Sequence, residues 1–397
     1  MPVVAARALA GAAALLVTVV ACGSGDGGAS PTTDPRPATT GGPVGEEQLL
    51  DWSARGPHGV GSQQLALDDG RRVAVWYPAE AGAGTDEPTG TFDITSLLSP
   101  ELQAQVPADA RPVHPVPAAP GAAPDRAAAP YPVVLFSHGF AGFPEQSADL
   151  VTHLASWGYV VAAPDHVERS LSGLLGTAAQ GVPRRDDPEV LAATLDLVLA
   201  RATVAGPLEG MVDGTRVGVA GHSAGASAAY RLAATDERVD AFAAYSVGSG
   251  QGDRALPEPP AVPGLVMVGE DDGIIEPRAT RAVFEAMEPP KYMASIADSG
   301  HLVFSDLCLI GAEQGGLVGI VERIGLPIPD DLLRLASDGC GEGALPVEEA
   351  FPAIDALSVA FFRAHLDEEV GAADALQPGP LKGLDGDAEV RVSAQPG

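Results

Sequence analysis

The sequence predicts a doubly wound α/β fold with a mostly parallel sheet, on the basis of three observations. Between residues 131 and 365, short apolar segments alternate with amphipathic ones, as in sheets whose two faces are covered by helices. Two segments of alternating polarity flank Asp68-Asp69-Gly70, which predicts an antiparallel hairpin ahead of the parallel strands. Several apolar segments end in polar or glycine-rich stretches, and sites in such folds lie at the carboxyl ends of the strands.

Each element follows from its own pattern of apolar residues. Strands are expected where short β-branched or apolar runs are bounded by turn residues, and helices where apolar residues recur every three or four positions. The predicted strands span residues 62–67, 72–77, 133–136, 159–163, 217–220, 239–246, 265–268 and 292–296. The predicted helices span residues 145–157, 188–204, 277–287 and 348–365, with a shorter helical piece at 94–106.

The first 22 residues have the pattern of an export signal. Arg7 precedes an apolar run, 9–20, that ends in Val19-Val20-Ala21-Cys22. A small residue before a cysteine at this place resembles the lipobox of bacterial lipoproteins, in which Cys22 would be lipidated and become the mature N-terminus. An ordinary secretory signal with an incidental cysteine stays open as an alternative. The run is shorter than the roughly 20 residues that span a bilayer, so we expect a secreted, lipid-anchored protein at the cell surface.

The rest of the chain divides into a tether, one domain and a tail. Residues 23–45 are rich in Gly, Ser, Thr and Pro, which predicts a flexible tether. Residues 46–370 form one domain of ample length for a core. It contains a Pro- and Ala-rich insertion, 79–129, expected to lie over the surface rather than in the core, and a small cap, 302–346, after the last strand. The polar tail, 371–397, is predicted to be disordered.

Cysteine usage agrees with export. Apart from Cys22, the chain has Cys308 and Cys340, both within the predicted cap. In an oxidising compartment this pair would most simply form one disulfide that staples the cap. Two unpaired buried thiols are the alternative.

The charge balance excludes some partners and says little about chemistry. The chain has 53 acidic and 23 basic residues, a formal net charge of -30. Such a charge argues against binding to nucleic acid or to anionic membrane surfaces. The acidic residues are spread along the chain, so we interpret them as a solvated surface.

The motif Gly221-His222-Ser223-Ala224-Gly225 carries the strongest chemical signal. The apolar run 216–220 precedes it and the Ala-rich stretch 226–234 follows it, which predicts a strand, a sharp turn and a helix. A serine hydroxyl is a poor nucleophile and must be held clear of the backbone, beside a base and oxyanion donors. The two glycines leave room for that turn, so Ser223 is predicted to be a nucleophile.

The nucleophile needs a histidine base, and proteins with such a turn keep the chain order Ser, acid, His. Two histidines follow Ser223: His365 inside the predicted closing helix, and His301 directly after the strand 292–296. His301 is therefore the expected base; as a mere surface-loop histidine it would leave Ser223 without a partner. The acid is expected after the strand 265–268, where Glu270, Asp271 and Asp272 offer three carboxylates in a row.

An oxyanion hole needs two backbone N–H groups, one from the residue after the nucleophile and one from the loop after an earlier strand. Ala224 would supply the first. Ser137-His138-Gly139-Phe140 ends the strand 133–136, so Phe140 would supply the second. His138 is expected to shape this loop rather than to act as a second base.

Four segments together carry a resemblance to a known family: residues 131–140, 154–166, the motif around Ser223, and 300–306. They resemble α/β-hydrolases of the platelet-activating-factor acetylhydrolase, chlorophyllase and dienelactone-hydrolase-like group, which has bacterial polyesterases and cutinase-like lipases as relatives. The resemblance covers roughly residues 60–366. This sequence departs from it in three ways: its nucleophile is serine rather than the cysteine of dienelactone hydrolases proper, the insertion has no counterpart, and the cap is long.

The resemblance implies an α/β-hydrolase fold and hydrolysis of carboxylic esters through a Ser-His-Asp triad and an acyl-enzyme. Similar hydrolases place the acid three residues after the glycine that ends the strand, which selects Asp272 and leaves Asp271 as the alternative. The side chains of Phe143, Leu302 and Phe304 flank the expected site and suggest an apolar pocket, or else ordinary packing under the cap.

We expect short- to medium-chain acyl, lipid-like or polyester substrates, a monomer, and no cofactor or metal, because no histidine and carboxylate cluster with ligand spacing lies outside the triad. Two other functions stay open. One is another acyl-transfer enzyme of this fold, such as a peptidase, thioesterase or acyltransferase. The other is a catalytically silent lipoprotein that keeps the scaffold for binding.

Overall fold

The computed structural model describes residues 52–84, 90–108, 111–178, 181–250, 255–325, 329–381 and 388–397. The expected export signal, Cys22 and the tether lie outside these residues. Among the helices in the described ranges, none has the length and apolar character that crossing a membrane requires.

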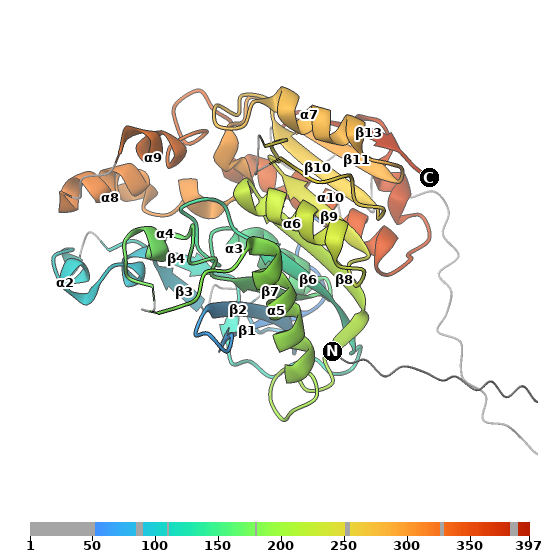
Figure 1. The fold of residues 1–397 in the computed structure, drawn as a ribbon, viewed down its shortest axis with the longest axis horizontal. Coiled ribbons are helices and arrows are strands. Elements are labelled where there is room, and N and C mark those ends of the chain that lie inside the picture. The colour runs from blue at the N-terminus through green and yellow to red at the C-terminus, as the bar shows by residue number, and fades with distance from the viewer. Residues whose placement is uncertain are drawn as a thin grey trace, which may run out of the picture. The chain divides into compact units, whose positions relative to one another are not determined.

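The predicted α/β fold with a mostly parallel sheet is confirmed. In the described part of the chain, eleven strands form one sheet in the order β12-β13-β11-β10-β9-β8-β6-β7-β2-β1-β5 (Figure 1). The strands from β7 to β11 pair in parallel, and β1 and β2 form the predicted antiparallel hairpin. Their bounds are β1 Gly59–Ala66, β2 Arg72–Ala79, β5 Ala119–Pro120, β6 Tyr131–Ser137, β7 Val160–Pro164, β8 Val212–His222, β9 Ala241–Tyr245, β10 Gly264–Gly269, β11 Lys291–Ile296, β12 Gly379–Pro380 and β13 Val390–Gln395.

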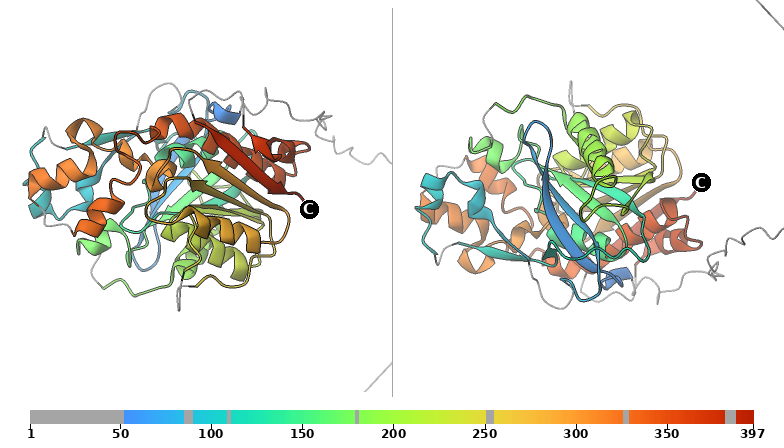
Figure 2. Two further views of the ribbon diagram at one scale, coloured as in Figure 1. Left: turned by 90° about the horizontal axis from the view of Figure 1, so that it is seen from above. Right: turned by 90° about the horizontal axis from the view of Figure 1, so that it is seen from below.

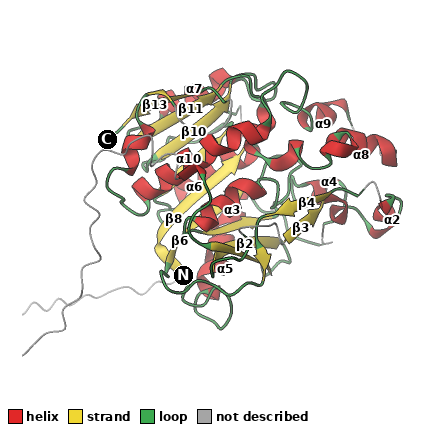
Figure 3. Ribbon diagram, turned by 180° about the vertical axis from the view of Figure 1, so that it is seen from behind, coloured by secondary structure: helices red, strands yellow, loops and turns green. Residues whose placement is uncertain are grey.

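Helices cover both faces of this sheet. Figure 1 shows α5, Asp187–Arg201, α6, Ala224–Thr235, and α7, Pro277–Ala286, on one face. The view from behind in Figure 3 shows α3, Ala148–Ser156, and α10, Val347–His365, on the other. Successive side chains of a strand point to opposite faces, and β6 accordingly sends its residues alternately into two hydrophobic clusters. Burial on both faces explains why these strands are continuous apolar runs.

The insertion differs from its prediction. Its strands β3, Gly90–Asp93, and β4, Val113–Val116, pair antiparallel. Phe92, Ile94 and Leu97 are buried in the main core, so the expectation that residues 79–129 lie only over the surface is wrong. In β3, Thr91 is exposed and Phe92 is buried. The high proline and alanine content of the insertion made this short alternation difficult to recognise in the sequence.

The helical piece expected at 94–106 is two short helices instead. They are η1, Ile94–Leu97, and α2, Pro100–Gln103. Ser99 caps α2 through its side chain, which accepts from the Leu102 N–H at 3.3 Å. Pro100 has no N–H to donate into a preceding turn, so it begins a helix instead of continuing one.

The cap after β11 is built from short helices and lies beside the insertion, as both views of Figure 2 show. A disulfide joins Cys308 to Cys340, with the two Cα atoms 5.2 Å apart. The cap elements are η4 His301–Phe304, η5 Asp306–Cys308, η6 Ala312–Gln314, α8 Gly316–Ile324 and α9 Asp330–Leu335.

The predicted disordered tail is wrong for its described residues, 371–381 and 388–397. After the short helix η7, Ala372–Leu376, the chain returns as β12 and β13, and β13 pairs antiparallel with β11 from Val390 to Gln395. The strand expected at 292–296 is therefore not the last. Val390 and Val392 are buried, whereas Arg391 between them is exposed. This alternation of buried and exposed residues is short and lies in a polar segment, so the sequence pattern did not predict the strand.

Candidate active site

The segment around Ser223 forms the predicted strand, sharp turn and helix. Ser223 lies between β8 and α6 with φ 59° and ψ -118°, a conformation that non-glycine residues rarely adopt. Its N–H donates to the Tyr245 carbonyl at 2.8 Å, which fixes the turn to β9. A Cβ atom at Gly221 would lie 2.3 Å from the Gly225 oxygen, and one at Gly225 would lie 1.9 Å from the Ser137 oxygen. Only glycine fits these two positions.

The structure brings Ser223, His301 and Asp272 together. The Ser223 hydroxyl lies 2.9 Å from His301 Nε2, and His301 Nδ1 lies 2.8 Å from Asp272 Oδ2. All three side chains are buried. With the Nδ1 proton donated to the carboxylate, Nε2 is left to accept the serine proton.

Asp272, and not Asp271, faces His301. The second oxygen of Asp272 accepts from the N–H groups of Ile274 at 2.9 Å and Ile275 at 2.7 Å, while Asp271 is exposed. Burial alone would raise the pKa of Asp272, but the hydrogen bonds and the charge of His301 together with the Ile275 N–H lower it below its usual value. The Asp272 side chain is therefore an ionised carboxylate at neutral pH.

The two expected oxyanion donors flank Ser223. Ala224 is the first residue of α6, so its N–H has no acceptor within the helix. Phe140 lies on the loop after β6, and the preceding Gly139 is close enough that a Cβ there would lie 3.5 Å from the Ser223 Cβ. The Gly139 N–H donates to Gln146 Oε1 at 2.9 Å, which fixes the loop just before Phe140.

Sequence reasoning missed the hydrogen-bonded bridge behind the triad. His222 Nε2 donates to the His301 carbonyl at 2.9 Å, because a carbonyl can only accept. Its Nδ1 then accepts from the Gln146 amide at 3.0 Å. Burial, and then the neighbouring His301, lower the pKa of His222 to about 3, so this ring is neutral. Through Gln146 the bridge continues to Gly139, so it joins the base to the oxyanion loop.

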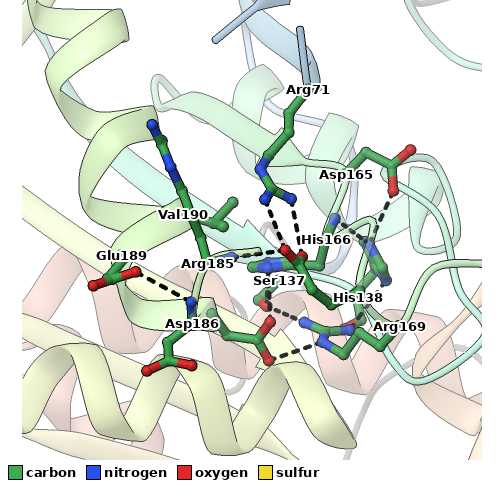
Figure 4. A network of polar contacts seen from close by, with 12 residues as sticks. Arg71, Ser137, His138, Asp165, His166, Arg169, Arg185, Asp186, Glu189 and Val190 are labelled. Atoms are coloured by element: carbon green, nitrogen blue, oxygen red, sulfur yellow. Dashed lines mark hydrogen bonds and ion pairs between the residues drawn. The ribbon is translucent and has the colours of Figure 1, made fainter. Parts of the chain in front are cut away.

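A buried polar network holds the oxyanion loop from its other side (Figure 4). The Arg169 guanidinium donates to the carbonyls of His138 and Gly139, the latter at 2.8 Å, and to the Ser137 hydroxyl at 2.9 Å. Its Nε donates to Asp187 at 2.9 Å. Burial, followed by the charge of Arg169, holds the pKa of His138 well below its usual range. His138 is a neutral member of this network, in keeping with a shaping role.

An apolar cavity of about 140 Å³ opens beside Ser223 and His301. Four parts of the chain build its walls: the insertion, the loop after β6, the short helix α4, Leu171–Leu174, and the cap. Phe140 lines it and is 45% exposed, so its ring borders the opening to solvent. The other apolar side chains of the wall are Ile94, Leu98, Ala141, Phe143, Leu171, Leu175, Leu302, Leu307, Leu317, Val318, Ile320, Val321, Leu332, Leu333, Leu335 and Ala336.

Two of the three expected pocket residues line this cavity, and one does not. Phe143 and Leu302 are part of the wall, and Phe143 stacks on Phe92 of the insertion with ring centroids 4.7 Å apart. The assignment of Phe304 to the pocket is wrong. Its buried ring packs against Tyr245, with centroids 5.6 Å apart. In a helix with three residues per turn, residues 302 and 304 point to different sides, so only Leu302 reaches the cavity.

Within the described ranges, no group of three or more His, Cys, Asp or Glu side chains is arranged to hold a metal ion. The expectation that the reaction needs no metal stays a prediction.

Comparisons with known proteins relate the chain to hydrolases. Residues 118–301 match the sequence model of a family described as the dienelactone hydrolase family. The matched stretch contains Phe140, Ser223 and Asp272 and ends at His301, so it excludes the cap. The chain is also similar to a ferulic acid esterase from Streptomyces cinnamoneus, with 25% sequence identity and a TM-score of 0.50; the match covers 78% of this chain and 90% of that one. No curated protein sequence matches the chain.

Proposed function

We propose that this chain, an α/β-hydrolase whose residues 118–301 form a dienelactone hydrolase family domain, is a serine hydrolase of carboxylic esters. One observation carries the proposal. His301 lies 2.9 Å from the Ser223 hydroxyl and 2.8 Å from the buried carboxylate of Asp272, at the wall of an apolar cavity. This is the arrangement that nucleophilic attack on an acyl carbon requires.

In the first half of the reaction, Ser223 Oγ would attack the ester carbonyl while His301 Nε2 takes the hydroxyl proton. The N–H groups of Phe140 and Ala224 would stabilise the negative charge on the carbonyl oxygen. His301 would then protonate the leaving alcohol, and Asp272 would stabilise the imidazolium in between. In the second half, His301 would deprotonate a water that attacks the acyl-enzyme, which releases the acid and restores Ser223.

The cavity supports an apolar acyl group of short to medium length. A dry cavity of about 150 Å³ holds a molecule the size of benzene, and this one measures about 140 Å³. Lipid-like and polyester substrates also offer such a group. The similar structure is named as a ferulic acid esterase, and this likeness supports an ester rather than an amide or thioester as the substrate of this chain.

The direct test is release of p-nitrophenol from acyl esters of graded length, with Ser223→Ala beside the wild type. Removing the nucleophile should lower kcat by about 10⁴-fold or more. Ser227→Ala removes a hydroxyl one turn further along α6 and should leave the rate unchanged. Equal rates for Ser223→Ala and the wild type would show that Ser223 is not the nucleophile, and turnover of no ester would contradict the proposed function.

A second test concerns the cap wall of the cavity. Val321→Trp in α8 should fill the cavity and shift the preference toward the shortest acyl esters. Glu322→Trp, on the exposed side of the same helix, adds the same ring outside the cavity and should leave the preference unchanged. A loss of long-chain activity in both variants would assign the effect to the helix rather than to the cavity.

The proposal also includes export and lipid anchoring through Cys22, which rest on the sequence around the apolar run 9–20. Expression in a bacterium with labelled palmitate should label the wild type. Cys22→Ser should remain unlabelled and should be lost from the membrane fraction. Equal amounts of the wild type and of Cys22→Ser in the membrane fraction would contradict anchoring through Cys22.

A further inference from the structure

One carboxylate of the cap contacts both loops that carry the triad base and acid. Asp338 Oδ1 accepts from the His301 N–H at 2.6 Å and from the Gly273 N–H at 3.3 Å. Gly273 directly follows Asp272, so a single oxygen atom joins the backbone of the base to the turn that presents the acid. Sequence reasoning assigned no role to Asp338, which lies 37 residues after His301.

Asp338 packs closely against the glycine residues of both loops. The Leu302 N–H donates to the Asp338 carbonyl at 3.1 Å, so the two segments also bond through their backbones. A Cβ atom at Gly300 would lie 2.5 Å from the Gly339 Cα and 2.7 Å from Asp338 Oδ1. A Cβ at Gly273 would lie 2.5 Å from Asp338 Oδ2. Glycines on both sides therefore allow an approach that any side chain would prevent.

The disulfide anchors this segment to the body of the domain. Cys340 follows Asp338 by two residues, and its partner Cys308 ends η5. Asp306, which begins η5, accepts from the Asp149 N–H in the first turn of α3 at 3.1 Å. The Asp306 N–H donates to the Gln146 carbonyl at 2.8 Å. Cys308 is thus fixed to α3, and the disulfide passes this restraint on to Asp338.

We propose that Asp338, held in place by the Cys308–Cys340 disulfide, is a positioning residue for the triad. This positioning role rests on the proposed function and deepens it. The cap would support the catalytic base as well as form a wall of the cavity. Asp338 keeps the loops after β10 and β11 together, and so keeps His301 Nδ1 at 2.8 Å from Asp272. The Asp271 N–H also donates to the Ser299 carbonyl at 3.0 Å, so the two loops stay joined without Asp338. The His301 N–H, however, would lose its acceptor, and the backbone of the base would no longer be bonded to the turn after Asp272.

The substitutions separate a hydrogen-bond acceptor from a charge. Asp338→Ala removes the acceptor and should lower kcat by about 10- to 100-fold with little change in KM, the effect of misplacing a reacting group by about 1 Å. Asp338→Asn keeps an oxygen at the same place and should restore most of kcat. Asp331→Ala, an exposed acidic residue of the same cap, should match the wild type.

The disulfide is tested by replacing both cysteines with alanine. Cys308→Ala/Cys340→Ala should lower kcat in the same direction as Asp338→Ala, and by a smaller factor. Combining these changes with Asp338→Ala should lower kcat no further than Asp338→Ala alone, because both act through one contact. If the combined variant instead lowered kcat by the product of the two separate factors, the disulfide would not act through Asp338.

A readout that does not depend on hydrolysis keeps this inference distinct from the proposed function. The His301 Nδ1 proton, hydrogen-bonded to Asp272, should give a downfield proton resonance in the wild type that weakens in Asp338→Ala and returns in Asp338→Asn. This result in a protein that hydrolyses no ester would support the positioning role and overturn the proposed function alone. An unchanged resonance and kcat in Asp338→Ala, even with a lower Tm, would overturn the positioning role; if that variant fails to fold, the cysteine variant decides by the same two measurements.

Discussion

The two halves of the candidate active site are held by different means. On the oxyanion side, the loop before Phe140 is fixed by the buried Arg169, which bonds three consecutive residues and pairs with Asp187. On the base side, His301 and Asp272 sit on backbone turns, and the nearest outside support is the Asp338 carboxylate of the cap.

The difference concerns where each support comes from. Arg169 and Asp187 lie within residues 118–301, the stretch that matches the family, whereas Asp338 lies beyond it. A change in the cap can therefore reach the base without touching the oxyanion loop. The His222 bridge is the direct polar connection between the halves, because it links the His301 carbonyl to Gln146 and so to Gly139.

The largest effect is expected on the base side. Asp272→Asn should lower kcat by about 10⁴-fold, because a neutral amide cannot stabilise the imidazolium and permits the wrong tautomer of His301. Asp271→Asn, one residue away and exposed, should leave kcat unchanged. Steady-state rates on one p-nitrophenyl ester measure both. A greater loss from Asp271→Asn would reverse the assignment of the acid.

On the oxyanion side we expect loss of both stability and rate. Arg169→Met leaves the Asp187 carboxylate without its cation and the buried His138 carbonyl without its donor, so the free energy of unfolding should fall by about 3–5 kcal/mol. In the variant that remains folded, kcat should fall by about 100-fold. The control is Arg238→Met, which removes the exposed ion pair with Asp196 and should cost at most about 1 kcal/mol. Urea unfolding measures the loss in both variants. Equal losses would show that the buried network does not hold the loop.

The bridge between the halves should have a smaller effect. His222→Phe keeps a ring of similar size but leaves the His301 carbonyl and the Gln146 amide without their partner. We expect kcat to fall by about 10-fold, because the base loses the hydrogen bond that His222 donates to the His301 carbonyl. In a double variant with Asp338→Ala, the two losses should multiply, because the two contacts hold His301 independently. A double variant no slower than Asp338→Ala would show that the base has one support rather than two.

A buried carboxyl group outside both halves should affect stability alone. His153 Nε2 donates to the Trp52 carbonyl, so its Nδ1 can only accept, and Asp355 lies 3.1 Å from it. Asp355 must therefore carry a proton. Burial, and then the neighbouring Asp149, raise the pKa of Asp355 well above its usual range, whereas burial lowers the pKa of His153 to about 3.

The sign of the pH effect follows from this proton. Below the usual carboxyl pKa of about 4, Asp355 is protonated in the folded and unfolded states alike. As the pH rises to 7, only the unfolded chain releases this proton, so the contribution of Asp355 to the free energy of unfolding falls. Asp355→Asn should lessen this fall by more than about 1 kcal/mol, because its amide can donate to His153 at every pH. Urea unfolding of the wild type and of Asp355→Asn at pH 4 and pH 7 measures this difference. An equal change in the free energy of unfolding in both proteins would show that Asp355 is ionised when folded.

The sequence predicted the parts of the site that follow a strand. Ser223, His301 and the oxyanion loop each come directly after an apolar run, and the carboxyl ends of parallel strands meet at one edge. The choice between Asp271 and Asp272 depends on one residue in a turn, which the Ile274 and Ile275 N–H groups decide only in three dimensions.

The supports of the site carried no local pattern. Arg169 lies 30 residues from Gly139, and Asp338 lies 37 residues from His301, so their contacts could not be seen in any window of the sequence. The insertion was placed outside the core because its proline and alanine content outweighed three buried residues, Phe92, Ile94 and Leu97. Short alternating strands such as β13 are hidden by polar composition for the same reason.

The pairing of β13 with β11 has a consequence for folding. β13 is the last strand in the sequence and covers the edge of β11 that faces away from β10. Until residues 390–395 pair with it, the open edge of β11 can pair with another chain, which is the usual route to aggregation through unpaired strands. The C-terminal strand thus acts as the final closure of the sheet, and shortening the chain before Val390 would leave that edge open for the life of the protein.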